Sequence, residues 1–309
     1  MSRRLPAFVA LVALAVTSTV GCGSIADHSS PLEPTASDTA TIAAPFSGIA
    51  AIEAIEREHD VTVGFAALGD GGRTLEYAGD DRFAYASTLK VFVAAALPDA
   101  VPADDRAADV RWTQAQVDAS GYSPVTSQHI DAGSTLEALA EAAVRTSDNT
   151  AANLVMDAVG GPAGVEAYLR ELGDAASVVT DHEPELNTVT AGSERNTTKP
   201  MAFATALQQV FESDSLPEAE RRMLLEWMSD NATGDALIRA GAPSGWTVAD
   251  KSGGAGGVRN DIAVVTTPKG ERLYVAIFTA ENDPTATYSD AVVEEVARVV
   301  LAEFAPPSG

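Results

Sequence analysis

Strand-like runs lie at both ends of this chain and helical patterns fill the middle, and that order constrains the fold more than any other feature. Near the start, the residue pattern in 61–68 and 73–78 predicts two strands joined by the turn Asp70-Gly71-Gly72. Near the end lie three further strand-like runs, at residues 246–251, 262–266 and 272–279. Both ends of the chain must then contribute strands to one sheet, and the helices between them form an insert.

Helical periodicity predicts the elements that cover the sheet and fill the insert. Residues 48–58 and 288–304 carry apolar side chains at helical spacing, so one helix from each end of the chain would cover the sheet. Within the chain we expect helices at residues 134–147, 149–158, 163–172, 200–211, 217–228 and 234–240. Ser134, with Glu137 three residues later, predicts a capping box for the first of these.

Two stretches show little periodicity. Residues 98–128 are polar and predict no regular element. Residues 180–198 contain many turn-forming residues and predict a long loop. Compact domains keep loops of this length mainly for function, so a functional side chain is expected in the second stretch.

The first 45 residues predict export. Residues 1–21 combine a basic start, a short apolar run and small residues, as a signal peptide does. The stretch before Cys22 resembles the bacterial lipoprotein box, which implies that Cys22 is acylated and anchors the protein to the outer face of the membrane; ordinary secretion is the alternative. Residues 22–45 are rich in Ser, Thr, Pro and Asp and predict a flexible tether, so the folded domain spans residues 46–309.

Composition narrows the partners. A formal charge of −24, from 44 acidic and 20 basic residues, excludes nucleic acid and an anionic membrane surface as partners. A membrane would be reached only through the lipid on Cys22, the only cysteine, and the folded domain can form no disulfide. We expect a monomer that takes a small-molecule substrate. The histidines lack metal-ligand spacing, so no metal and no cofactor is expected; they are His28, His59, His129 and His182.

The stretch Ser87-Thr88-Leu89-Lys90 places a hydroxyl and an amine three residues apart at the start of an apolar helix. Three residues are close to one turn, so the two side chains share a face and can come within hydrogen-bond reach. The apolar residues 91–97 predict a buried helix, and burial would lower the pKa of Lys90 and make it a candidate base for Ser87. Taken alone, the motif also fits a capped helix with a lysine that reaches solvent.

Two further polar stretches carry candidate site residues. Ser147-Asp148-Asn149 lies at a break between helices, where the hydroxyl can relay a proton and the amide can hold a carbonyl; a plain helix cap is the alternative. Lys251-Ser252-Gly253-Gly254 ends a strand, where glycine lets a substrate backbone approach and the two side chains before it can receive a carboxylate. The N–H groups of Gly254 and Ser87 are candidates for an oxyanion hole.

The long loop contains a carboxylate and an amide four residues apart, Glu183 and Asn187. Together they can grip one water, and a carboxylate that orients water is a general base for ester hydrolysis. The alternative is an acidic loop residue exposed to solvent.

Together, Ser87-x-x-Lys90, Ser147-Asp148-Asn149 and Lys251-Ser252-Gly253 resemble the motif set of class A serine β-lactamases. The stretches Glu183-Pro184-Glu185-Leu186-Asn187 and Tyr122-Ser123-Pro124-Val125 extend the resemblance, which covers nearly the whole folded domain. The resemblance implies an α+β fold class, in which an all-helical lobe is inserted into an α/β lobe with a five-stranded antiparallel sheet flanked by helices. Residues 81–198 would form the helical lobe, and residues 46–80 and 199–306 the α/β lobe.

The resemblance also implies an activity, the hydrolysis of the β-lactam amide bond of penicillin- and cephalosporin-type antibiotics. Ser87 would attack the carbonyl and form an acyl-enzyme, with Lys90 or Glu183 as the acylation base. Ser147 would pass a proton to the lactam nitrogen, and Glu183 with Asn187 would hold the water that releases the product. The residues implied to bind substrate are Tyr122, Asn149, Lys251, Ser252, Gly253, Gly254 and Arg259.

The sequence departs from the family pattern in the long loop. Asp181 and Asn196 stand at its neck, where the family usually pairs an arginine with an aspartate, and a hydrogen bond in place of that ion pair predicts a looser loop and slower deacylation. His182 stands where an aromatic residue is usual, and plain packing is its expected role.

Two alternatives share the motifs. A D,D-peptidase or penicillin-binding protein has the three motifs but no carboxylate placed like Glu183. A lipid-tethered envelope protein that traps β-lactams without turnover would acylate at Ser87 and then stall.

Overall fold

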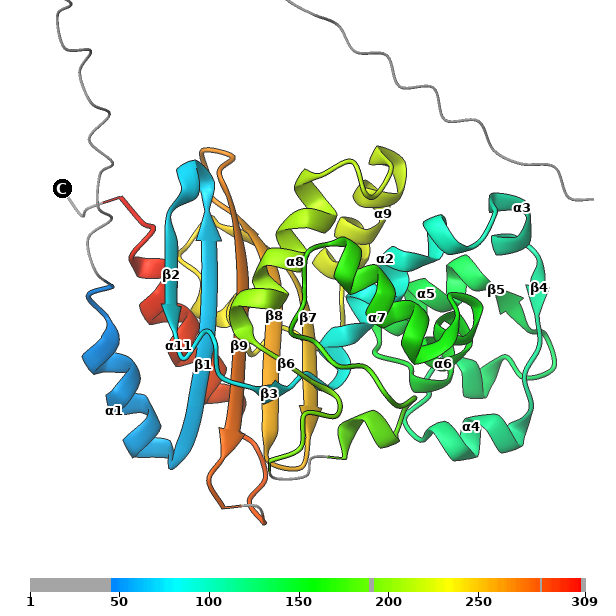
Figure 1. Ribbon diagram of the computed structural model, residues 1–309, viewed down its shortest axis with the longest axis horizontal. Coiled ribbons are helices and arrows are strands. Elements are labelled where there is room, and N and C mark those ends of the chain that lie inside the picture. The colour runs from blue at the N-terminus through cyan, green and yellow to red at the C-terminus, as the bar shows by residue number, and fades with distance from the viewer. Residues whose placement is uncertain (1–45, 189–191, 284, 307–309) are drawn as a thin grey trace, which may run out of the picture. The chain divides into compact units, whose positions relative to one another are not determined.

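A computed structural model describes residues 46–188, 192–283 and 285–306 (Figure 1). These residues belong to one compact unit, which spans residues 43–309. The predicted signal peptide, the predicted lipidation site Cys22 and the predicted tether lie outside the described residues.

Five antiparallel strands form the central sheet, in the order β2-β1-β9-β8-β7 (Figure 1). They are β1 (Val61–Gly69), β2 (Thr74–Tyr77), β7 (Thr247–Ala255), β8 (Val258–Thr266) and β9 (Arg272–Glu281). The first strand pairs with the last along its whole length, with Phe65 opposite Ile277. The predicted fold class and the assembly of one sheet from both ends of the chain are therefore confirmed.

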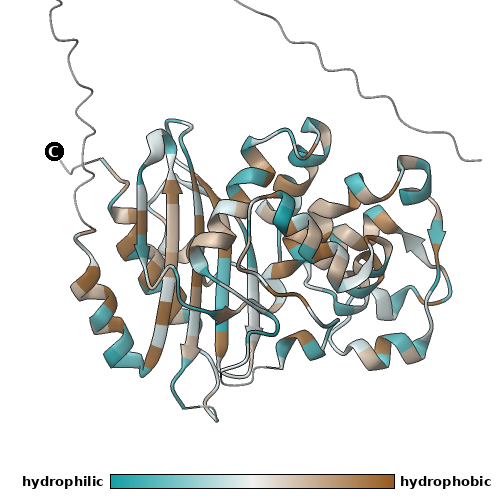
Figure 2. Ribbon diagram, viewed as in Figure 1, coloured by the Kyte–Doolittle hydropathy of each residue, from teal (hydrophilic) through white to brown (hydrophobic). Residues whose placement is uncertain are grey.

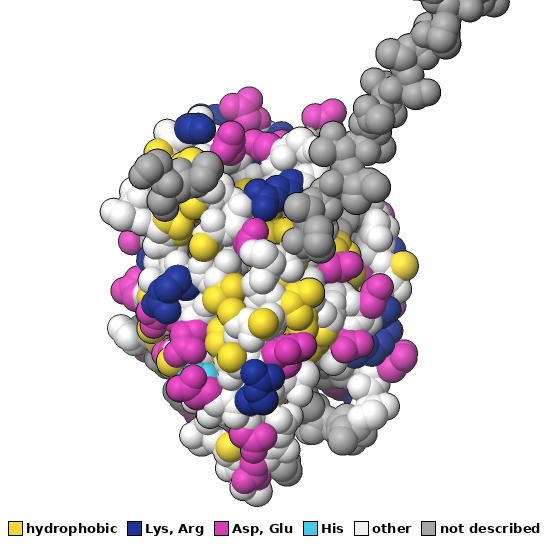
Figure 3. All heavy atoms as spheres, turned by 90° about the vertical axis from the view of Figure 1, so that its left-hand side faces the viewer, with side chains coloured by type: hydrophobic (Ala, Val, Ile, Leu, Met, Phe, Trp, Pro, Cys, Tyr) yellow, Lys and Arg dark blue, Asp and Glu magenta, His cyan; other side chains and the backbone are white. Residues whose placement is uncertain are grey.

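Helices from the two ends cover one face of the sheet. They are α1 (Ile49–His59), α11 (Asp290–Ala302) and the short α10 (Ile238–Gly241). In Figure 2, α1 carries both hydrophobic and hydrophilic residues along its length, as a helix with one buried face does. Ile52 and Ile55 of α1 join Val292 and Val296 of α11 in the core on this side. Figure 3 looks onto this side from outside, where apolar side chains gather near the centre of a surface rich in acidic groups.

The opposite face of the sheet is covered by α8 (Pro200–Glu212) and α9 (Glu218–Ser229). Beyond α9 lies the helical insert, whose central helix α2 (Lys90–Ala100) packs against α5, α6, α7 and α9. Every residue from Lys90 to Leu97 is buried, which is why this stretch is apolar on all sides. The other helices of the insert are α3 (Ala103–Arg106), α4 (Gln114–Ser120), α5 (Leu136–Arg145), α6 (Asn149–Ala158) and α7 (Gly161–Glu171).

Two short antiparallel ladders, each of two strands, accompany the helices of the insert. β3 (Phe83–Ala84) pairs with β6 (Thr197–Thr198), and this ladder joins the end of the long loop to the residues just before Ser87. β4 (Asp109–Val110) pairs with β5 (Ser134–Thr135).

Three expectations about local structure were wrong. Ser134 does not cap α5, because it pairs with Val110 in a strand and the next residue, Thr135, accepts the capping hydrogen bond from Ala138 N. Two helices, α3 and α4, and the short strand β4 lie within the stretch for which no element was predicted. The helix expected at residues 234–240 is shorter and begins only at Ile238.

Candidate active site

Ser87 lies in a 3₁₀ turn, Ala86–Leu89, that leads directly into α2. The turn packs against strand β7 at Gly253, where a Cβ atom would lie 2.9 Å from the carbonyl oxygen of Tyr85 and 3.0 Å from the backbone nitrogen of Thr88. Only glycine allows this approach. The strand that carries Lys251 is thereby held against the turn that carries Ser87.

Lys90 is buried, and burial lowers its pKa, an effect that the Glu183 carboxylate opposes. Its ammonium group donates to the carbonyl oxygen of Ser147 at 2.8 Å and to Asn149 Oδ1 at 2.6 Å, and it lies 3.0 Å from Glu183 Oε1. With a longer contact to Ser147 Oγ at 3.3 Å, four acceptors share the three N–H donors of the amine. Ser87 Oγ donates instead to the same Glu183 oxygen, at 3.0 Å. The expected pairing of the serine with the lysine is thus replaced by a shared carboxylate.

Two lysines converge on the hydroxyl of Ser147. Lys90 Nζ donates to Ser147 Oγ at 3.3 Å and Lys251 Nζ donates to it at 3.1 Å. A hydroxyl has two acceptor lone pairs and one proton, so both lone pairs are occupied and the proton is left for another acceptor. Ser147 has a positive φ of 59°, a sparsely populated conformation for a residue with a side chain, which places its backbone carbonyl and its hydroxyl near the same amine.

Lys251 is fully buried on β7. Burial, together with the nearby charge of Lys90, lowers the pKa of Lys251 to about 7. Its ammonium group also donates to the carbonyl oxygen of Ser252 at 2.7 Å. A lysine so poorly solvated and so close to a second cation is suited to receive an anion.

Glu183 is 3% exposed, so it is not the solvent-exposed loop acid of the alternative explanation. Asn187 Nδ2 donates to Glu183 Oε2, and Asn187 Oδ1 is buried without a hydrogen-bond partner among the described residues. The peptide bond between Glu183 and Pro184 is cis. The hydrogen bonds of Glu183 to Ser87 Oγ and to Asn187 Nδ2 bring the carboxylate and the side-chain amide of the loop to the nucleophile.

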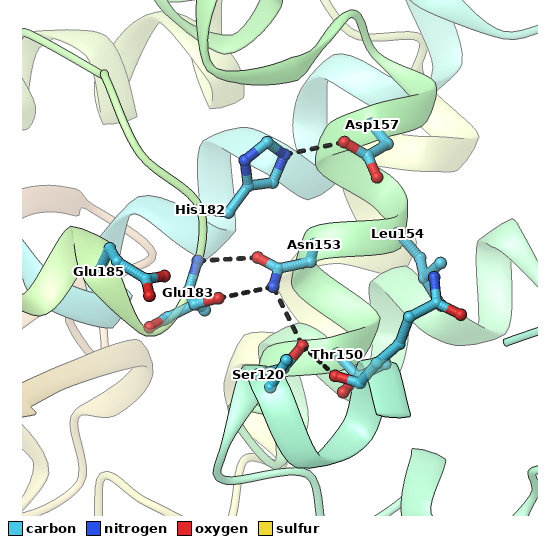
Figure 4. Close-up of a pocket in the computed structure, with 10 residues that line it drawn as sticks. Ser120, Thr150, Asn153, Leu154, Asp157, His182, Glu183 and Glu185 are labelled. Carbon is cyan, nitrogen blue, oxygen red and sulfur yellow. Dashed lines mark hydrogen bonds and ion pairs between the residues drawn. The ribbon is translucent and has the colours of Figure 1, made fainter. Parts of the chain in front are cut away.

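Asn153 of α6 holds the backbone of Glu183, and the sequence analysis missed it. Its Nδ2 donates to the Glu183 carbonyl oxygen and its Oδ1 accepts from the Glu183 backbone nitrogen, both at 2.8 Å (Figure 4). The available signal was its position four residues after Asn149, because such residues share a helix face.

Asp148 supports the site from the N-terminal end of α6. Its carboxylate accepts hydrogen bonds from the backbone nitrogens of Val125 and Thr126, both at 2.9 Å, and from that of Ala151 at 2.8 Å. It therefore caps α6 and ties down the stretch that follows Tyr122. Tyr122 itself is 61% exposed, as a side chain at the entrance of a site would be.

The remaining predicted substrate-binding residues lie along β7 and β8. Gly254 pairs with Arg259 across the two strands, and a Cβ atom on Gly254 would lie 3.1 Å from Arg259 Nη1. Arg259 is held by Asp290, whose Oδ1 accepts from its Nε at 2.7 Å. Ser252 Oγ donates to Thr233 Oγ1 at 2.8 Å. The structure thus brings Ser252, Gly254 and Arg259 to the same end of the sheet as Lys251.

Contrary to the expectation, the neck of the long loop contains an ion pair. Asn196 Nδ2 does donate to Asp181 Oδ2 at 2.7 Å, and Arg195 Nη2 also reaches both Asp181 oxygens at 2.7 Å. These hydrogen bonds, first of all that from Asn196, hold the pKa of Asp181 below its usual range. The arginine is supplied by the residue before Asn196, so the premise of the looser loop was wrong.

His182 does not simply pack, as was expected. Its Nε2 lies 2.8 Å from Asp157 Oδ1, and the imidazole is 38% exposed (Figure 4). Because a carboxylate can only accept, Nε2 carries the proton in this hydrogen bond.

Within the described ranges, no cluster of three His, Cys, Asp or Glu side chains is suited to hold a metal ion. No helix in the same ranges is long and apolar enough to cross a membrane.

Comparison with known proteins identifies the family to which this chain belongs. A family model described as the β-lactamase enzyme family matches residues 48–304. The chain belongs to the β-lactamase enzyme family. This β-lactamase is 40% identical to a β-lactamase of Bacillus licheniformis over 249 residues, which cover 80% of each chain. It is 38% identical to a β-lactamase of Mycobacterium tuberculosis over 304 residues, which cover 96% of each.

Solved structures place this β-lactamase in class A. The crystal structure of a class A β-lactamase from Clostridium kluyveri matches 82% of this chain and 97% of its own, with a TM-score of 0.79 and 36% sequence identity. The structure of a class A β-lactamase of the last common ancestor of Gram-negative bacteria matches this chain with a TM-score of 0.78 and 38% sequence identity. The resemblance read from the sequence is therefore confirmed.

Proposed function

We propose that this chain hydrolyses the amide bond of β-lactam antibiotics through an acyl-enzyme on Ser87, which a water activated by Glu183 then releases. The observation that carries the proposal is the hydrogen bond from Ser87 Oγ to Glu183 Oε1 at 3.0 Å, with Lys90 Nζ on the same oxygen. One buried carboxylate is thereby within reach of both the nucleophile and the amine.

In the acylation step, Ser87 Oγ attacks the lactam carbonyl carbon and its proton passes to Glu183, which faces the hydroxyl directly. This geometry favours Glu183 over Lys90 as the acylation base. Once Lys90 has given one of its protons to Ser147, the 3.0 Å contact lets Glu183 pass the serine proton to the amine. The N–H groups of Ser87 and Gly254 would stabilise the oxyanion.

The C–N bond then breaks, and the lactam nitrogen must gain a proton. Ser147 is the proposed donor, because Lys90 and Lys251 occupy both of its acceptor sites and can replace the proton that it gives away. The substrate carboxylate would bind to Lys251, Ser252 and Arg259, with Asn149 on a substrate carbonyl and Tyr122 at the entrance.

In the deacylation step, water attacks the ester carbonyl and its proton passes to Glu183. The bond from the carbonyl carbon to Ser87 Oγ then breaks, and Glu183 returns the proton to Ser87 Oγ. Asn187 Oδ1, which has no hydrogen-bond partner among the residues the structure describes, supports this role, since a water held between Glu183 and Asn187 could donate to both. A penicillin-binding protein or a β-lactam trap would have no use for a carboxylate in this position.

Steady-state turnover of one penicillin and one cephalosporin tests the proposal. The intact protein should turn over both repeatedly, and Ser87→Ala should turn over neither while folding normally. A stoichiometric burst without turnover in the intact protein would refute hydrolysis and identify a trap.

We further propose that the protein is exported as a monomer and anchored to the outer face of the membrane by acylation of Cys22. The support for export and anchoring is the N-terminal sequence alone. Fractionation of cells that express the native chain and Cys22→Ser tests it. The native chain should stay with the membrane and Cys22→Ser should not; equal release of both would instead indicate ordinary secretion.

A further inference from the structure

One face of α6 carries three polar side chains at successive intervals of four residues, Asn149, Asn153 and Asp157. Residues four apart on a helix lie above one another, so the three form a row. Their partners are, in order, the amine of Lys90, the backbone of Glu183 and the imidazole of His182. The first two partners belong to the proposed chemistry, whereas the third has no assigned role.

We propose that the His182–Asp157 pair is a positioning pair that keeps the Glu183 carboxylate in place for deacylation. The inference rests on the proposed function of Glu183. Neither member of the pair touches the reacting atoms. His182 acts through its peptide bond to Glu183, and Asp157 acts through His182.

The space behind this part of the loop explains why a polar tie is needed. A cleft of about 300 Å³ opens between α4, α6 and residues 182–185, so apolar packing does not fill the space behind the loop there (Figure 4). An aromatic side chain would provide packing area, but the imidazole of His182 instead reaches across to Asp157. Polar contacts with α6 must then fix the path of the backbone.

Two contacts hold the backbone better than one. The hydrogen bonds to Asn153 hold the backbone of residue 183 alone, whereas the contact with Asp157 holds residue 182. Asp157 lies one turn further along α6, about 6 Å away along the helix axis. A second tie at that distance opposes the rotation that would swing the Glu183 carboxylate away from Ser87.

The expected effect is modest, because the side chains of His182 and Asp157 are 38% and 65% exposed. Exposed pairs of this kind contribute little, which corresponds to a change of about two- to five-fold in a rate. Deacylation should slow by that factor in His182→Ala and in Asp157→Ala. Asp157→Asn should retain the native rate, because its amide oxygen can still accept from the imidazole.

The test measures the two steps separately. Acylation is followed as the burst of a chromogenic cephalosporin, and deacylation as the decay of the acyl-enzyme mass after the substrate is exhausted. A slower deacylation alone should lower kcat and KM together and leave kcat/KM unchanged, which a general loss of structure would not do. The double variant should be no slower than either single variant, because both remove the same contact.

A matched control is available elsewhere in the chain. His59 Nε2 lies 3.2 Å from Glu295 Oε2 between α1 and α11, in a pair that is also partly exposed and is remote from Ser87 in the fold. His59→Ala should leave both steps unchanged.

The possible results separate the two proposals. An acyl-enzyme that decays at the native rate in both His182→Ala and Asp157→Ala would overturn the positioning role, as would additive effects or an equal loss in acylation. If the native protein forms no acyl-enzyme at all, the proposed function has failed.

Discussion

Replacing Asn196 should destabilise the loop at its neck. The side chain is 2% exposed, its Oδ1 accepts from Tyr85 Oη at 3.1 Å and from Thr180 N at 3.1 Å, and its Nδ2 donates to Asp181. Asn196→Ala leaves a backbone N–H unpaired and removes a hydrogen bond to a carboxylate, each of which costs about 1–3 kcal/mol. The φ of 54° adds roughly 1 kcal/mol for alanine.

The expected loss for Asn196→Ala is therefore about 3 kcal/mol after the loop relaxes, measured by urea unfolding at pH 7. Amide hydrogen exchange should show the loss concentrated in residues 180–198. Asn196→Asp is the matched variant, since it tolerates the same backbone but turns a second carboxylate toward Asp181. Its loss should shrink as the pH falls and one acid becomes protonated. Native stability of Asn196→Asp at pH 7 would refute the reasoning.

Three further predictions concern Lys251, Ser147 and Asp261. Because the ammonium group of Lys251 is lost as the pH rises through about 7, kcat/KM should fall above that pH, and Lys251→Arg should extend the profile to higher pH. Ser147→Ala should lower the burst rate of acylation by roughly 100-fold or more, and an unchanged rate would exclude it as the proton donor. Burial raises the pKa of Asp261, so its contribution to stability is full at low pH and is lost as the pH rises. In urea unfolding at pH 7, Asp261→Asn should therefore be more stable than the native chain by about 1 kcal/mol. Near pH 4 the gain should be smaller.

The sheet and most helices could be predicted because their apolar residues recur with the period of each element. Helix α4 was missed because it is mostly exposed and has little periodicity, although Thr113 and Gln116 form a capping box that its sequence does carry. A helix cap was instead predicted at Ser134, but this residue pairs with a neighbouring strand and does not cap the helix.

The candidate site was predictable in its residues but not in its contacts. Ser87, Lys90 and Glu183 all lie where the motifs place them, yet the sequence gives no sign that the serine donates to the glutamate and not to the lysine. The partner of His182 is 25 residues away, and spacing along the chain cannot reveal such a contact. Motifs specify which groups are present, whereas packing decides which of them meet.

The central claim is that the carboxylate of Glu183 frees the enzyme from its own acyl intermediate. The direct measurement is the mass of the Ser87 peptide after Glu183→Gln is mixed with a penicillin. Ring opening adds every atom of the antibiotic, so the adduct has its full mass. Glu183→Gln also slows acylation, because Glu183 is the proposed base of that step, but the account predicts that the adduct, once formed, decays at least about 100-fold more slowly than in the native chain. That factor corresponds to about 2.7 kcal/mol in the barrier of deacylation. Release at the native rate from Glu183→Gln would contradict the account.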